Sequence, residues 1–154
     1  MVRGVRMGSL ASLKMDLSYL LTPFIAWLVA GCLKFLVNTI AARKLAFGLI
    51  GYGGLPSNHS AIVSSMATLI ALKEGIQHPA FGVAITLGFI VILDASSLRK
   101  QVGKQATTLN ALTKTLNPKQ PKLRERMGHT PSEILAGVLT GLCVAYFVST
   151  IRFA

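Results

Sequence analysis

The sequence has few acidic residues, few cysteines and little charge. Only 5 of its 154 residues are Asp or Glu, 14% are charged, and 52% are hydrophobic, with a mean hydropathy of +0.58. This composition excludes a disordered chain and is too apolar for an ordinary soluble domain. Cys32 and Cys143 lie in apolar stretches, where they give neither a disulfide framework nor a metal-binding pair.

Apolar residues gather in runs long enough to cross a bilayer. A hydrocarbon core of about 30 Å needs roughly 20 helical residues, and no alternating pattern of barrel strands is visible. We therefore predict one all-α domain over residues 1–154, an integral membrane helical bundle of about four membrane helices plus an amphipathic interfacial helix. The four apolar segments are residues 17–37, 56–72, 75–93 and 134–151.

The remaining positions are strongly basic. The chain has 16 Lys and Arg and a formal net charge of +11, but its long uncharged runs fit a nucleic-acid partner poorly. Residues 1–16 form a basic N-terminal segment, followed by an apolar run longer than that of a signal peptide, which predicts a retained helix. Residues 98–128 form a basic amphipathic connection, and its helical half is expected to lie in the headgroup layer.

Ionisable side chains at membrane depth are costly and therefore informative. Lys34 and Asp94 are the clearest cases. For Lys34 the alternative is a side chain that extends from the helix end to the interface. For Asp94 the alternative is a pairing with Arg99 or Lys100 at a helix end.

Two histidines occur where helices are expected to begin. In residues 53–60, Gly-Gly-Leu-Pro-Ser-Asn-His-Ser, the glycines permit close approach to a ligand, and a capped helix start with free N–H groups favours an anion. His59 lies in this first turn. In residues 128–133, Gly-His-Thr-Pro-Ser-Glu, Thr130 and Glu133 form a capping-box pattern. Glu133 is also four residues after His129, so its carboxylate either caps the helix or orients the imidazole, and both alternatives remain open.

Alternating helices bring these groups to one membrane surface. The ends of the first and third segments and the starts of the second and fourth share that face, whereas His78 lies on the opposite side. Two imidazoles, several cations, carboxylates and two helix N-termini form a set suited to phosphate. Cations and N–H groups stabilise a transferring phosphoryl group, one histidine attacks phosphorus, and the other protonates the leaving alkoxide. This chemistry needs no metal and no cofactor.

Three motifs resemble the divergent bacterial and plastid branch of the type 2 phosphatidic acid phosphatase superfamily, which includes vanadium haloperoxidases. They are Gly-Gly-Leu-Pro-Ser-Asn-His-Ser-Ala, Asp-Ala-Ser-Ser-Leu-Arg-Lys and Gly-His-Thr-Pro-Ser-Glu, in this order within about residues 20–150. The superfamily motifs are Lys-x6-Arg-Pro, Pro-Ser-Gly-His and Ser-Arg-x5-His-x3-Asp. The resemblance implies a helical bundle, with His129 as the nucleophile that forms a phosphohistidine and His59 as the general acid.

The same resemblance implies roles for four further residues, although this sequence departs from the superfamily motifs at several positions. Glu133 stands for the orienting Asp, and Lys34 for the lysine of the first motif. The residue seven beyond Lys34 is alanine, so Arg43 is only the nearest candidate for the first-motif arginine, and Arg99 is favoured over Arg124 for the third. The predicted catalytic residues are His129, His59, Glu133 and Asp94, and the predicted substrate-binding residues are Lys34, Arg43, Gly54, Ser57, Asn58 and Arg99.

A membrane bundle with such a site predicts a lipid phosphatase that acts on a monoester of the phosphatidylglycerophosphate or phosphatidate type. The alternatives are a polyprenyl pyrophosphate phosphatase, a metal enzyme with His129, Glu133 and His59 as ligands, and a non-catalytic protein that binds anionic lipid. Small residues of the second segment, Ala61, Ser64, Ser65 and Thr68, predict close helix packing, either within one chain or in a homo-oligomer.

The distribution of basic residues predicts the orientation. Without Lys34, ten Lys and Arg fall on the face with the histidines and five on the other face. The positive-inside rule therefore predicts that the active face is cytoplasmic, in a bacterial inner membrane or its organelle equivalent.

Overall fold

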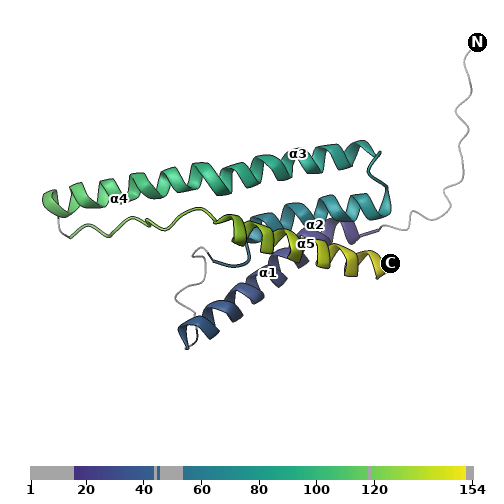
Figure 1. Ribbon diagram of the computed structural model, residues 1–154, viewed down its shortest axis with the longest axis horizontal. Coiled ribbons are helices and arrows are strands. Elements are labelled where there is room, and N and C mark those ends of the chain that lie inside the picture. The colour runs from purple at the N-terminus through teal and green to yellow at the C-terminus, as the bar shows by residue number, and fades with distance from the viewer. Residues whose placement is uncertain (1–15, 44, 46–53, 118, 152–154) are drawn as a thin grey trace, which may run out of the picture.

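The protein, described here by a computed structural model, is built from helices. The structure describes residues 16–43, 45, 54–117 and 119–151, so most of the basic N-terminal segment and Gly53 of the first histidine motif lie outside the described residues. The elements are α1 (Ser18–Ala42), α2 (Asn58–Lys73), α3 (Pro79–Leu93), the π-helical turn η2 (Asp94–Leu98), α4 (Arg99–Leu116) and α5 (Pro131–Thr150), and they are drawn in Figure 1.

Three helical stretches are long and apolar enough to cross a membrane: Ser18–Ala42, Pro79–Leu116 and Pro131–Thr150. The second predicted segment forms α2, which has 16 residues and is shorter than a typical span. Large apolar side chains on the other helices, such as Phe24, Phe89 and Phe147, are exposed, as expected where lipid replaces water. The prediction of an all-α membrane bundle is confirmed.

Helix α2 lies at the centre of the bundle and packs against α1, α3 and α5. Small residues make this possible: a Cβ at Gly137 of α5 would meet the Ser57 carbonyl oxygen, and one at Gly141 would meet Ser64 Oγ. Ser64 Oγ also donates to the Val138 carbonyl across this interface at 3.3 Å. The predicted close packing through small residues therefore occurs within the chain.

Helices α3 and α4 form one rod, which Figure 1 shows extending well beyond the other helices. The rod has 38 residues, or about 57 Å at the rise of an α-helix, so it is much longer than a bilayer core of about 30 Å. No proline interrupts residues 94–116, and η2 passes directly into α4. The amphipathic segment was expected to lie along the headgroup layer, but it continues the axis of α3 instead.

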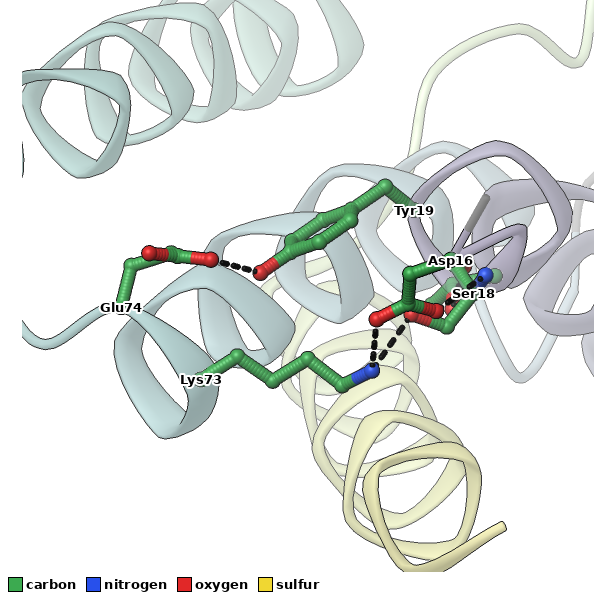
Figure 2. Close-up of polar contacts among 6 residues, drawn as sticks. Asp16, Ser18, Tyr19, Lys73 and Glu74 are labelled. Atoms are coloured by element: carbon green, nitrogen blue, oxygen red, sulfur yellow. Dashed lines mark hydrogen bonds and ion pairs between the residues drawn. The ribbon is translucent and has the colours of Figure 1, made fainter. Parts of the chain in front are cut away.

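A polar cluster joins the start of α1 to the end of α2 (Figure 2). His59 lies in the first turn of α2, so this cluster is at the opposite end of that helix. Lys73 Nζ donates to Asp16 Oδ2 at 2.6 Å and to Ser18 Oγ at 2.7 Å. Tyr19 Oη donates to Glu74 Oε1 at 2.5 Å. The bond from Lys73 lowers the pKa of Asp16 to about 2, so this carboxylate is charged throughout the physiological range.

Candidate active site

Two helix starts bring the histidines together. His59 lies in the first turn of α2, and His129 lies two residues before α5. The Ser57 N–H donates to the Glu133 carbonyl oxygen at 2.9 Å, which ties the two helix starts to each other. The imidazole rings meet edge to face, with centroids 6.1 Å apart and planes at 77°. The convergence expected from alternating helices is thus present in the structure.

Side chains cap both helix starts. The Ser57 hydroxyl accepts from the Ser60 N–H at 3.3 Å, and Ser57 is fully buried. At α5, Thr130 Oγ1 accepts from the Glu133 N–H at 3.3 Å, while Glu133 Oε2 accepts from the Thr130 N–H at 2.8 Å. This is a complete capping box. Of the two alternatives for Glu133, the structure therefore forms the cap, and the carboxylate makes no hydrogen bond to His129.

Unpartnered polar atoms are concentrated at this site. Among the residues that the structure describes, the buried side-chain nitrogen and oxygen atoms without a hydrogen-bond partner are Asn58 Oδ1, His59 Nδ1 and both ring nitrogens of His129. His129 is only 7% exposed. Buried polar groups without partners are rare in native proteins, so their grouping at two helix N-termini makes these residues the candidates for contact with a polar ligand.

The π-helical turn positions His129 from a third element. The His129 N–H donates to the Ala95 carbonyl oxygen at 2.9 Å. Gly128 precedes it with φ +84°, and a Cβ there would lie 3.2 Å from that same oxygen and closer still to Lys100. Glycine is required at this position because residues with a side chain rarely adopt this backbone conformation, and because there is no space for a Cβ. The end of the α3 span thus holds the loop that carries His129.

Asp94 and Arg99 form an ion pair on this turn. Arg99 Nε lies 2.7 Å from Asp94 Oδ2, and both side chains are about one-third exposed, at 35% and 34%. The charges of both residues act on His59. Asp94, predicted as catalytic, is therefore the ion-pair partner of Arg99, which was the alternative interpretation of this residue.

Helix α1 contributes a cation and an amide. Lys34 is half-buried, and its charge acts on both histidines. Asn38, one turn later, faces Gly54: a Cβ at Gly54 would lie 3.4 Å from Asn38 Oδ1. Asn38 is not among the residues predicted from the sequence, although its spacing of four residues from Lys34 places both on one helix face.

Burial lowers the pKa of His129, and the charge of Lys34 lowers it further, while Glu133 acts in the opposite direction. The imidazole therefore stays neutral to lower pH than an ordinary histidine, whose pKa is about 6.5. A neutral imidazole has a lone pair available at neutral pH. This is the protonation state that a nucleophile requires.

Arg43 lies apart from this group. It is exposed and ends α1 with φ 51°, about 13 Å along the helix axis from Lys34. Arg124 lies nearer, since its charge acts on Lys34. In the described part of the chain, no group of three or more His, Cys, Asp or Glu residues is arranged to hold a metal ion.

Comparison with known proteins decides the family. Residues 15–144 match the family described as the Divergent PAP2 family. The chain belongs to this divergent PAP2 family. The resemblance inferred from the three motifs is confirmed.

One relative of the chain is the "Uncharacterized membrane protein YuiD" of Bacillus subtilis (strain 168). It is 35% identical over 148 residues, which cover 83% of this chain and 94% of that protein. No solved structure matches the chain. This divergent PAP2 protein is therefore an integral membrane protein with a relative of nearly the same extent, and its histidine site lies within the matched region.

Proposed function

We propose that the protein is a lipid phosphatase that hydrolyses a phosphate monoester through a phosphohistidine on His129, without a metal. The observation that supports this proposal is the pair of imidazoles 6.1 Å apart with unpartnered buried nitrogens. A ring nitrogen of His129 attacks phosphorus, and the bond from phosphorus to the lipid oxygen breaks. Burial and the charges of Arg99 and Lys34 lower the pKa of His59 as well, so His59 takes up its proton together with the phosphate dianion and gives it to the departing oxygen.

The second step returns the enzyme to its starting state. Neutral His59 removes a proton from water, the resulting hydroxide attacks the phosphohistidine, and the N–P bond breaks to release inorganic phosphate. His129 leaves this step neutral, and His59 is again protonated. Lys34, Arg99 and the N–H groups at the starts of α2 and α5 stabilise the phosphoryl oxygens in both steps.

An apolar groove supports a lipid substrate. It lies between α1 and α5 with a volume of about 480 Å³, and its lining includes Leu33, directly before Lys34. We assign it to one hydrocarbon chain of the substrate, whose phosphate lies at the histidines. The lining residues are Ile25, Val29, Leu33, Leu139, Thr140, Cys143, Val144, Phe147, Val148 and Ile151.

Phosphate release by purified protein tests the proposal. The substrates are phosphatidylglycerophosphate, phosphatidate and undecaprenyl pyrophosphate, each assayed with EDTA present. We expect release from a monoester lipid that survives the chelator. Preference for the pyrophosphate would support the polyprenyl alternative, loss of activity with EDTA would support a metal enzyme, and no release from any lipid by folded protein would contradict a phosphatase.

The pH profile tests the state of His129. Because the pKa of His129 is lowered, we expect the midpoint of the acid limb of kcat/KM to lie below about pH 6.5, the ordinary value for a histidine. The substitution Lys34→Met removes one cause of this lowering, so the limb is expected to move to higher pH as kcat/KM falls. A limb that stays in place in the variant would contradict the coupling of Lys34 to His129.

Filling the groove tests the substrate chain. Cys143 lines it and is free, so Cys143→Trp is expected to raise KM for long-chain lipid phosphates about tenfold or more and to leave a dibutanoyl analogue unaffected. Cys32→Trp, at the other exposed cysteine, is the matched control outside the lining. Equal loss for both chain lengths would contradict the assignment.

We further propose that the active face is cytoplasmic. Lys119 follows α4, and Gln77 lies between α2 and α3 at the opposite end of the rod; both are exposed. In a background without Cys32 and Cys143, we expect an impermeant maleimide added to spheroplasts to label Gln77→Cys but not Lys119→Cys. The reverse pattern would place the active face outside.

A further inference from the structure

Helix α4 carries an apolar seam that nothing in the phosphatase proposal uses. Its members recur at alternating steps of four and three residues, which is the 3.5-residue period of a coiled coil. Most are well exposed: Leu109 is 48% exposed, Leu112 57% and Leu116 83%. The seam consists of Leu98, Val102, Gln105, Leu109, Leu112 and Leu116. We infer that it pairs with the same seam of a second copy in a short parallel coiled coil.

The rod geometry makes this seam available. The apolar span ends where Arg99 and Lys100 begin α4, so the 18 residues of α4 continue about 27 Å beyond the membrane. Figure 1 shows α4 clear of the other helices, with the non-helical residues 119–128 returning along it. Two copies in one bilayer share one orientation, so their α4 helices project side by side and parallel.

The charges are arranged to permit pairing. Residues 99–128 contain eight Lys or Arg and a single acidic residue, Glu125, so two copies would repel each other if these cations faced the seam. In the heptad notation abcdefg, the seam occupies positions a and d, with Val102 and Leu109 at a. Lys100 and Lys114 then fall at f, and Lys104 falls at c, so all three point away from the partner helix. The flanking e and g positions beyond Arg99 are uncharged: Gln101, Ala106, Thr108, Thr113 and Thr115. Like charges therefore do not oppose one another across the interface.

The chain already covers a neighbouring face of α4. Asn110 Nδ2 donates to the Leu123 carbonyl and to Glu125 Oε1, and the Leu123 N–H donates to Asn110 Oδ1, each at 2.8 Å. A Cβ at Gly103 would meet the Glu125 carbonyl oxygen, and Gly103 and Ala106 are buried. The returning segment, residues 119–128, thus covers the b and e side of the helix at Gly103, Ala106 and Asn110. It leaves the seam and its g side open.

The length of the seam fits a membrane-confined partner. Fewer than three heptads bind weakly in free solution, but two spans in one bilayer hold their α4 helices at a high effective concentration. Gln105 is the one polar member of the seam. A single polar core residue of this kind fixes register at some cost in stability, so Gln105 opposite Gln105 of the second copy aligns the two helices without stagger.

Disulfide trapping in native membranes tests the pairing. In a Cys32→Ala, Cys143→Ala background, single cysteines are placed at Leu109 and Leu112 in the seam and at Lys114 on the far side. Mild oxidation is expected to give dimers from the first two at least about tenfold faster than from Lys114→Cys, because a disulfide needs Cα atoms within about 7 Å. Equal rates at all three positions, or no dimer from the seam positions, would overturn the inference.

A second variant separates pairing from lipid binding. The double substitution Leu109→Lys, Leu112→Lys alters only exposed positions, so the circular dichroism spectrum is expected to be unchanged while light scattering in mild detergent shifts from dimer to monomer. Gln105→Leu is expected to strengthen the dimer. A double variant that remains dimeric would overturn the inference. So would a monomeric unmodified protein whose α4 binds anionic vesicles and is released from them by the double substitution, because the seam would then bind lipid and not a second copy.

Discussion

Substituting His129 by alanine is expected to lower phosphate release by more than about 10⁴-fold, because the variant lacks the atom that attacks phosphorus. His129 is almost fully buried, and its backbone, which alanine retains, makes the hydrogen bond to Ala95. The fold is therefore expected to persist. Initial rates on a lipid phosphate, with helicity checked by circular dichroism, measure the effect.

Two further histidine variants make this result specific. His59→Ala is expected to lose about 10²- to 10⁴-fold with a lipid alkoxide leaving group, and far less with a nitrophenyl phosphate, whose leaving group needs no proton. His78 is exposed and caps α3 by accepting from the Ala80 N–H. His78→Asn keeps a cap and is expected to retain full activity. Retention of activity in His129→Ala would contradict the phosphohistidine mechanism.

The second large effect concerns the packing of α5 on α2. Gly141→Val is expected to destabilise the bundle by more than about 3 kcal/mol. A Cβ at this position would meet Ser64 Oγ and would lie 2.5 Å from the Ala61 carbonyl oxygen. The backbone has to move for any side chain to fit, and that movement also separates the helix starts that carry the two histidines. Thermal unfolding in detergent measures the loss.

Gly82 provides the matched control. It lies in α3, has no positive φ, and a Cβ there would meet nothing within 4 Å. Gly82→Ala is therefore expected to leave stability unchanged or to raise it slightly, since alanine has the higher helix propensity. If Gly141→Val melts at the same temperature as the unmodified protein, the close α2–α5 interface described here is wrong.

The helices and their starts follow directly from the sequence. Uncharged runs identify α1, α3 and α5, and proline with Thr130 and Glu133 predicts the capping box that the structure forms. Alternation of helices across a membrane predicts that His59 and His129 meet, although they lie 70 residues apart in the sequence. Their predicted chemical roles rest on the resemblance and remain a proposal.

The direction of α4 and the choice among cations did not follow from the sequence. An amphipathic period identifies an apolar face but not what covers it, so the sequence pattern alone does not distinguish a membrane surface from a partner helix. The continuity of the rod depends on η2, and no sequence signal separates a π turn from a helix end. Arg43 was only the nearest candidate for the first-motif arginine, because the motif spacing falls on an alanine, and helix rise places Arg43 about two and a half turns beyond Lys34.

Trapping the intermediate tests the central claim most directly. Purified protein is mixed with a ³²P-labelled lipid phosphate in EDTA, quenched in alkali during turnover, and digested for mass spectrometry. We expect phosphate on His129 alone, in a form that is stable to alkali and labile to acid. The label is expected to accumulate in His59→Ala when a nitrophenyl phosphate is the substrate, and to be absent in His129→Ala. Label on no residue while phosphate is released, or label on His59, would contradict it.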